Sequence, residues 1–264
     1  MAEVAVETRG GDPRLAAVRR IAIVPAFNEE ESVPQVIEEI RAFDPDFEVV
    51  VVDDGSADGT TAAAERAGAH VVRLPFNLGI GGAVQTGLRY AHDNGFRLAV
   101  RIDGDGQHDP SQLGSVLAPV LAGDADIAVG SRFAGRDGYR SSRSRRVGIR
   151  MLARIVSALV RQRVTDTTSG FQAVNRAGIA LFARDYPHDY PEVEAVVMVH
   201  RHRLRLVEVP VSMREREHGR SSITALRSIY YMIKVLLAIG VGLVRRRPVP
   251  APGDAAPVSA GAGI

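Results

Sequence analysis

The chain has 264 residues, of which 45% are hydrophobic and 24% are charged, and its formal net charge is +2. This length and composition are typical of a globular protein with one large domain and short appendages. The sequence contains no cysteine, which excludes disulfides, thiolate zinc sites and cysteine nucleophiles. Because the charge is nearly balanced, it gives little information about partners.

The two ends of the sequence differ from the middle. Residues 1–19 carry charges throughout and lack the apolar core of a signal peptide, so we expect a flexible extension and a cytoplasmic protein. Residues 248–264 are rich in Pro, Ala and Gly, which is typical of a disordered tail. The folded part is therefore expected between these two segments.

Between the ends, short apolar runs alternate with helical patterns. The runs predict strands at 21–25, 48–52, 70–74, 97–102 and 126–130, and the patterns between them predict helices at 30–43, 60–67, 82–94 and 110–121. Continuous Val and Ile runs that alternate with helices indicate an α/β fold. Its sheet is expected to be mostly parallel and covered by helices on both faces.

Polar residues follow three of the predicted strands directly. The segment 25–29 (PAFNE) ends the first strand, Asp53 and Asp54 end the second, and Asp103 and Asp105 end the fourth. Ligands of open α/β sheets bind beyond the carboxyl ends of the strands. We therefore expect these three loops to converge on one site.

The segment 103–110 (DGDGQHDP) gives the most information about chemistry. Asp103 and Asp105 lie one residue apart with glycine between and after them, so both carboxylates can turn towards one point. Hard cations such as Mg²⁺ and Mn²⁺ prefer oxygen ligands and often combine carboxylates with substrate phosphates. A cation here would neutralise the charge of a departing diphosphate. The alternative is a solvated turn.

Two neighbouring motifs have less specific meanings. Asp53 or Asp54 could bind a ribose hydroxyl or a base edge, whereas Asp58 is expected to cap the following helix. The segment 77–82 (NLGIGG) fails the G-x-G-x-x-G pattern because Val84 replaces the last glycine. It predicts a tight turn into a helix near the substrate that would carry the diphosphate, and it disfavours a dinucleotide site.

Seven motifs together resemble the family 2 glycosyltransferases, most closely the dolichyl- or polyprenyl-phosphate hexose synthases. They are PAFNEE, VVDDGSADGT, NLGIGGAVQTGL, DGDGQHDP, GSRF, DTTSGFQAVNR and EVPVSMREREHGRSS, in this order over roughly residues 20–225. The resemblance implies a GT-A (nucleotide-diphospho-sugar transferase) fold over residues 20–222 and an inverting reaction. It also implies a GDP-mannose or UDP-glucose type of donor held by Mg²⁺ or Mn²⁺.

The same resemblance assigns roles to individual residues. Those that would hold the nucleotide-sugar are Pro25, Phe27, Glu29, Asp53, Asp54, Asp103 and Arg216. Those that would hold the metal are Asp103, Asp105 and Gln107. Arg132 and Arg146 would bind the phosphate of a polyprenyl or dolichyl phosphate acceptor, since a guanidinium fork suits phosphate oxygens. Catalysis would therefore depend on Asp105, Arg132, Arg146 and Arg216.

The acceptor determines whether a base is needed. A lipid phosphate is already ionised near neutral pH, whereas a hydroxyl acceptor such as a growing glycan needs a base. Asp166, Glu192 and Glu194 are the candidates for that base, although Asp166 is rather expected to cap and order the acceptor loop. We expect His108 to be an ordinary loop residue.

Two segments are candidates for contact with a membrane. Residues 147–160 have an apolar helical stripe with arginines beside it, a pattern shared by interfacial and core-facing helices. Residues 229–244 are apolar but shorter than the roughly twenty residues of a span, and they include Lys234. We expect residues 223–247 to form a helix on the cytoplasmic membrane surface. Burial against the domain, a small membrane protein or a second copy is the alternative.

Three other functions are open at this stage. One is a family 2 glycosyltransferase with a hydroxyl acceptor. The second is a nucleotidyltransferase, which the DGDGQHDP segment disfavours. The third is a non-catalytic basic module that binds a membrane or nucleic acid, although we expect no nucleic acid partner. The sequence does not identify the sugar, the nucleobase or the length of the lipid.

Overall fold

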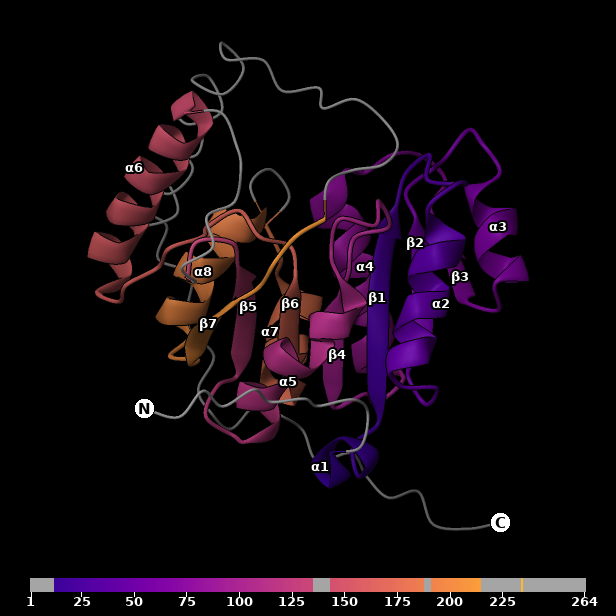
Figure 1. Ribbon diagram of the computed structural model, residues 1–264, viewed down its shortest axis with the longest axis horizontal. Helices are drawn as coiled ribbons and strands as arrows, with labels where there is room; N and C mark the ends of the chain where they lie inside the picture. Colours follow the sequence, from indigo (N-terminus) through magenta and orange to yellow (C-terminus); the bar gives the residue numbers. More distant parts are fainter. Residues whose placement is uncertain (1–11, 135–142, 188–190, 215–233, 235–264) are drawn as a thin grey trace.

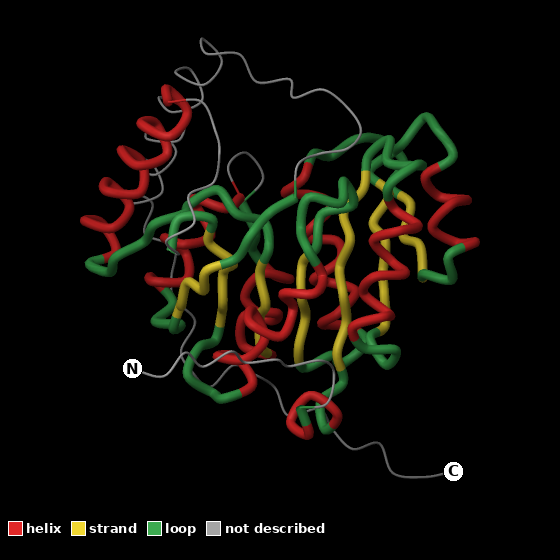
Figure 2. Tube along the Cα trace, in the orientation of Figure 1, coloured by secondary structure: helices red, strands yellow, loops and turns green. Residues whose placement is uncertain are grey.

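The computed structural model of the protein describes residues 12–134, 143–187 and 191–214, together with Lys234. Within this part, seven strands form one sheet in the order β3-β2-β1-β4-β6-β5-β7, with helices on both of its faces (Figures 1 and 2). The predicted helix at 223–247, except Lys234, and the predicted tail lie outside the described residues.

The sheet is mostly parallel, as predicted. The strands are β1 (Arg20–Ala26), β2 (Glu48–Asp53), β3 (His70–Arg73), β4 (Leu98–Arg101), β5 (Ile127–Ser131), β6 (Gln172–Asn175) and β7 (Leu206–Pro210). Only the pairings of β6 with β4 and β5 are antiparallel among the described strands. The five strands predicted from the sequence agree with β1 to β5 within one or two residues at each end.

The helices follow the predicted pattern with small changes at their ends. They are α1 (Pro13–Ala16), α2 (Val33–Phe43), α3 (Thr60–Arg66), α4 (Ile80–Asp93), α5 (Leu113–Leu121), α6 (Arg143–Val160), α7 (Arg176–Arg184) and α8 (Pro191–Arg201). A short 3₁₀ turn, η1 (Pro110–Gln112), precedes α5. The extension predicted over residues 1–19 has an ordered part, because Leu15 of α1 is buried.

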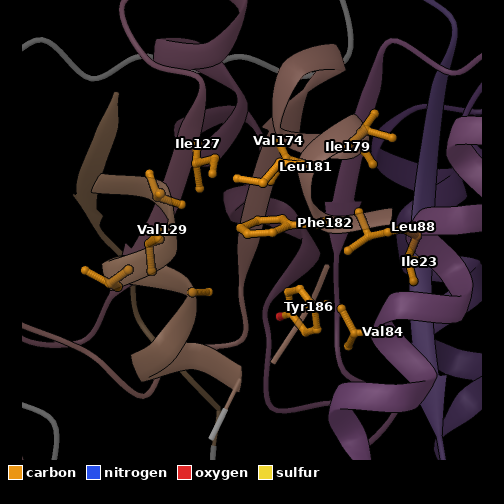
Figure 3. Packing of buried hydrophobic residues seen from close by; sticks show 14 of the residues in the cluster. Ile23, Val84, Leu88, Ile127, Val129, Val174, Ile179, Leu181, Phe182 and Tyr186 are labelled. Atoms are coloured by element: carbon orange, nitrogen blue, oxygen red, sulfur yellow. The ribbon is translucent and has the colours of Figure 1, made fainter. Parts of the chain in front are cut away.

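Alternate residues of β1 face two different layers of the core. Ile21 and Ile23 belong to the cluster that includes residues of α4, α7 and α8, while Ala22 and Val24 belong to the cluster with α2 and α5. Figure 3 shows the first cluster, where Ile23 and Phe182 are among the labelled side chains. This burial on both faces explains the continuous apolar runs in the sequence.

Gly87 on α4 sits directly against β1. A Cβ at this position would overlap Cγ2 of Ile23, a β-branched residue buried in the strand. We expect Gly87→Ala to reduce the free energy of unfolding by about 1–3 kcal/mol, as overpacking of a core does. Chemical denaturation measures this loss. Ile23→Ala removes the overlapping methyl, so the double variant should lose less than the sum of the single losses.

The reversed direction of β6 determines which loops share an edge of the sheet. Gln172, the first residue of β6, pairs with Arg101 at the end of β4 and with Val129 on β5. The segment 166–171, which leads into β6, therefore lies at the same edge as the carboxyl ends of the parallel strands.

Helix α6 lies beside α8, near the end of the sheet that β7 borders (Figure 1). Leu152, Val156 and Val160 are buried, whereas Met151 is 44% and Ile155 is 37% exposed. The apolar stripe predicted for this segment thus has a core-facing part and an exposed part. Among the described residues, no helix has the length and apolar character needed to cross a bilayer.

Candidate active site

Backbone hydrogen bonds join the loops at the carboxyl ends of β1, β2 and β4. The N–H of Asp54 donates to the carbonyl of Ala26 at 2.9 Å, and the N–H of Gly104 donates to the carbonyl of Pro25 at 3.1 Å. These bonds continue the sheet beyond the ends of the strands. The three loops that the sequence predicted to converge therefore lie side by side at one edge.

The loop after β4 carries the three predicted metal ligands. Asp103, Asp105 and Gln107 are all partly buried, and the backbone N–H of Gln107 donates to Oδ1 of Asp105 at 3.1 Å. The turn depends on Gly106, whose φ of 73° is left-handed. Two carboxylates and an amide oxygen match the preference of Mg²⁺ and Mn²⁺. Among the described residues, no three His, Cys, Asp or Glu side chains form a metal-binding group.

The side chain of Asp103 is fixed from two sides. Nε of Arg101 donates to its Oδ1 at 2.9 Å, and Nε2 of His108 lies 3.8 Å from its Oδ2. His108 is itself buried, stacks on Phe171 with ring centroids 5.1 Å apart, and accepts from the Asp103 N–H through Nδ1 at 3.0 Å. Burial lowers the pKa of the imidazole. His108 therefore does more than the ordinary loop residue predicted from the sequence.

Arg101 has a second carboxylate partner in addition to Asp103. Its Nη1 donates to Oε1 of Glu192 on α8 at 3.1 Å, and only 6% of the side chain is exposed. Burial opposes the charge of the guanidinium, but the two carboxylates outweigh it and raise the pKa of Arg101 above its ordinary value. Arg101 therefore stays charged and links α8 to the loop after β4.

The residues predicted to hold the nucleoside lie around the end of β1. Pro25 is buried within β1, and Phe27, the first residue beyond the strand, is 45% exposed. The N–H of Glu29 donates to Oγ1 of Thr60, and its carboxylate accepts from Oγ of Ser32 at 2.8 Å. Phe27 thus presents an aromatic face at the edge, while Glu29 braces the turn into α2.

Asp53 and Asp54 bind their own chain. Both are buried, and Asp54 accepts from the N–H groups of Leu78 and Gly79 at 2.7 and 2.9 Å. Asp53 accepts from the N–H of Ser56 at 2.8 Å and from the hydroxyl of Thr61. These contacts show that the pair shapes the loops beside Phe27, and their contact with a nucleoside stays a prediction.

Gly59, and not Asp58 as predicted, is the N-cap of α3, although Asp58 still bonds to the start of this helix. Its carboxylate accepts from the N–H of Thr60, the first residue of α3, at 3.0 Å and from the hydroxyl of the same residue at 2.5 Å. It also accepts from the N–H of Glu30 at 3.3 Å. Asp58 therefore ties the start of α3 to the loop that follows β1.

Arg132 forms a buried ion pair with Asp166 at the end of β5. Its Nε and Nη2 donate to the two carboxylate oxygens at 2.7 and 2.8 Å, and its backbone N–H donates at 3.2 Å. The same carboxylate accepts from the N–H and hydroxyl of Thr168. Asp166 thus orders its loop, as predicted. The contact of Arg132 with an acceptor phosphate stays a prediction.

Two of the predicted site arginines lie outside the described residues. They are Arg146 on the first turns of α6, of which only the side chain is left out, and the whole of Arg216. Arg214 is described, and its backbone N–H donates to the carbonyl of Gln107 at 3.0 Å. Its guanidinium also pairs with Glu39 and Asp109, at 2.7 and 2.8 Å. The chain two residues before Arg216 is therefore fixed to the proposed metal loop.

Sequence reasoning missed the roles of two side chains of this site, namely Arg101 and His108. Arg101 carried a signal, because an arginine inside an apolar strand must find a carboxylate when the strand is buried. His108 carried none, since a ring in a polar loop gives no local indication of burial.

Comparisons with known proteins agree with this geometry. The profile of the family described as "Glycosyl transferase family 2" matches residues 21–181. The chain is 31% identical to a polyprenol monophosphomannose synthase of Mycolicibacterium smegmatis, over 82% of this chain and 85% of the relative. It is 32% identical to an undecaprenyl-phosphate mannosyltransferase of Micrococcus luteus, over 78% of this chain and 88% of the relative.

A solved structure shares the fold. Glucosyl-3-phosphoglycerate synthase from Mycobacterium tuberculosis, in complex with Mn²⁺, UDP and glucosyl-3-phosphoglycerate, superimposes with a TM-score of 0.67 at 22% identity. The match covers 90% of this chain and 86% of that one. The GT-A-like fold and the resemblance carried by the seven motifs are thereby confirmed. The chain belongs to glycosyl transferase family 2 and is a glycosyltransferase.

Proposed function

We propose that the protein is an inverting, metal-dependent enzyme that moves a hexose from a nucleotide-sugar to a polyprenyl phosphate. The observation that carries this proposal is the edge where Phe27, Asp103, Asp105 and Gln107 lie on adjoining loops. An aromatic face suits a nucleobase, and oxygen ligands suit a cation that also binds a diphosphate. One relative is named a polyprenol monophosphomannose synthase, and another is named an undecaprenyl-phosphate mannosyltransferase.

Mg²⁺ or Mn²⁺ would be held by Asp103, Asp105 and Gln107, and when bound it would neutralise the charge of the leaving diphosphate. A phosphate oxygen of the acceptor forms the new bond to the anomeric carbon, while the bond from that carbon to the diphosphate breaks. The ionised phosphate brings its own negative charge, so no proton has to be removed. The protein's main contribution is to hold both substrates in line.

The ion pairs of the site favour a phosphate acceptor over a hydroxyl acceptor. Of the three candidate bases, Asp166 is paired with Arg132 and Glu192 is paired with Arg101. The guanidinium of Arg132 and its hydrogen bonds hold the pKa of Asp166 below its ordinary value, against the effect of burial, so this carboxylate is a weak proton acceptor. Arg132 and Arg146 remain the proposed ligands of the acceptor phosphate, and Arg216 the proposed ligand of the donor phosphates.

The proposed acceptor, a polyprenyl phosphate, is a lipid, so the enzyme would act at a membrane surface. We propose that it binds the cytoplasmic face peripherally, with residues 223–247 lying in the interface. The exposed Met151 and Ile155 on α6, beside Arg154, are consistent with a second contact. A small membrane protein or a second copy of the chain could cover residues 223–247 instead.

The proposal is tested by supplying radiolabelled GDP-mannose or UDP-glucose, Mn²⁺ and undecaprenyl phosphate in detergent. We expect label in the organic phase that depends on Mn²⁺ and on the acceptor's phosphate. Undecaprenol without phosphate and a soluble oligosaccharide are the acceptor controls. Transfer to the oligosaccharide alone would instead support the hydroxyl-acceptor function.

A further inference from the structure

We propose that Arg101, held in place by Glu192, is a positioning residue that orients the carboxylate of Asp103 towards the divalent cation. This inference rests on the proposed function, because it concerns the same metal loop. It assigns a role to two residues that would otherwise form only a buried structural ion pair.

The geometry places one guanidinium between two carboxylates. Nε of Arg101 donates to Oδ1 of Asp103 at 2.9 Å, while Nη1 donates to Oε1 of Glu192 at 3.1 Å. The two bonds use different nitrogens, so the planar guanidinium cannot turn without losing one of them. Glu192 thus sets the orientation of Arg101, which in turn sets the rotation of the Asp103 carboxylate.

One side of this arrangement is closed by an apolar wall. Tyr186 and Arg101 line a small cavity together with Ile23, Val84 and Phe182. Figure 3 shows Tyr186 near Val84 and Phe182. Burial raises the pKa of the Tyr186 hydroxyl to about 12, so it remains uncharged near neutral pH. A guanidinium against such a wall depends strongly on its carboxylate partners, because burial weakens its hydration.

Gly170 packs against the ion pair of Arg101 and Asp103. A Cβ on Gly170 would lie 2.6 Å from Nη2 of Arg101 and 2.9 Å from Oδ2 of Asp103. His108 lies 3.8 Å from the same Oδ2, while 28% of the Asp103 side chain is exposed. The carboxylate is therefore held on the protein side and open to a cation on the other.

The balance of charge gives Glu192 a specific effect on metal binding. With Glu192 present, the charge of Arg101 is divided between two carboxylates, and Asp103 keeps negative charge to offer to a cation. If Glu192 were neutral, Arg101 would pair with Asp103 alone and compete with the cation. Residues outside the coordination shell that orient a ligand commonly change metal affinity by about 10–100-fold.

The test is the affinity of the full chain for Mn²⁺ in the presence of UDP or GDP, measured by electron paramagnetic resonance. We expect Glu192→Gln, which keeps the size and hydrogen-bonding shape, to bind Mn²⁺ about tenfold or more weakly. We expect Arg101→Lys, which keeps the charge but loses the fork, to weaken binding and alter the Mn²⁺ spectrum.

A matched control comes from the other end of β1. Arg20 is about as buried as Arg101 and forms an ion pair with Asp44, with Nε to Oδ2 at 2.7 Å and Nη2 to Oδ1 at 2.9 Å. Arg20→Gln should therefore lower stability without changing the affinity for Mn²⁺. Thermal unfolding of all variants separates loss of fold from loss of metal.

The outcomes distinguish this inference from the proposed function. If the wild-type chain binds neither Mn²⁺ nor nucleotide, the proposed function fails and the inference fails with it. If the wild-type chain binds Mn²⁺ and Glu192→Gln binds it equally well, only the inference is overturned. The same holds if Arg20→Gln weakens Mn²⁺ binding as much as Glu192→Gln does.

Discussion

Asp105→Ala is expected to reduce sugar transfer at least about a thousandfold while leaving the fold intact. Metal-assisted stabilisation of a leaving group is worth several kcal/mol, and each 1.36 kcal/mol corresponds to roughly a factor of ten in rate. Asp105 is only partly buried, and its Oδ1 accepts from the N–H of Gln107. Initial rates at saturating donor and acceptor measure the loss, and calorimetry with Mn²⁺ and UDP or GDP measures binding.

The control for this variant is Asp124→Ala. Asp124 is an exposed residue that precedes β5, and so lies at the amino end of a parallel strand, away from the site. The same chemical change there should leave turnover and stability unaltered. If Asp105→Ala retained its activity, the proposed metal role of Asp105 would be wrong. If the wild-type chain and Asp105→Ala both lacked activity and bound anionic vesicles in a salt-sensitive way, a non-catalytic basic module would be the better explanation.

Arg132→Gln is expected to lower the free energy of unfolding by a large amount. Removing one partner of a buried ion pair leaves an uncompensated charge and typically costs about 3–5 kcal/mol. Arg132 and Asp166 are both buried, and their two side-chain bonds of 2.7 and 2.8 Å form a bidentate pair. Chemical denaturation at neutral pH measures the change in the free energy of unfolding.

The pH dependence of the same pair has a definite sign. Burial alone would raise the pKa of Asp166, but the guanidinium of Arg132 and the bonds from Thr168 outweigh it and hold the pKa below its ordinary value. The pair therefore contributes stability above the unfolded pKa of about 3.9, and this contribution is lost as the pH falls through the lowered value. Asp166→Asn should be less stable at pH 7 and lose less on acidification below about pH 4.

Arg205→Gln serves as the control for both measurements. It breaks the ion pair between Arg205 and Asp126, in which the arginine side chain is 57% exposed. An exposed pair of this kind contributes little to stability, because water screens it. If Arg132→Gln and Arg205→Gln lowered the free energy of unfolding equally, the buried Arg132–Asp166 pair would contribute no more to stability than an exposed pair.

The first half of the fold follows closely from the sequence. The sequence contains strong local signals for this half. They are the Val and Ile runs of β1 and β2 and the helical spacing of apolar residues in α2 and α4, since each of these elements buries several apolar side chains. The short strand β6, with the sequence QAVN, has no comparable signal. Its reversed direction depends on pairing with β4 and β5, which no local pattern contains.

The site divides in the same way. The convergence of the loops after β1, β2 and β4 could be predicted, because parallel strands end at one edge of a sheet. The partners of the charged residues at this edge could not be predicted. Arg101 and Glu192 are 91 residues apart, and Arg132 and Asp166 are 34 apart. Such pairs are chosen by tertiary packing, so the sequence identified the residues of the edge but not the ion pairs that hold them.

The reversed direction of β6 couples the segment that enters this strand to the loop after β4. Gly170 packs against Arg101 and Asp103, and the ring of Phe171 stacks on that of His108. The segment 166–171 also carries Asp166, the partner of Arg132 at the end of β5. A substitution in this segment is therefore expected to disturb both ion pairs, so relatives should vary it together with the loop after β4.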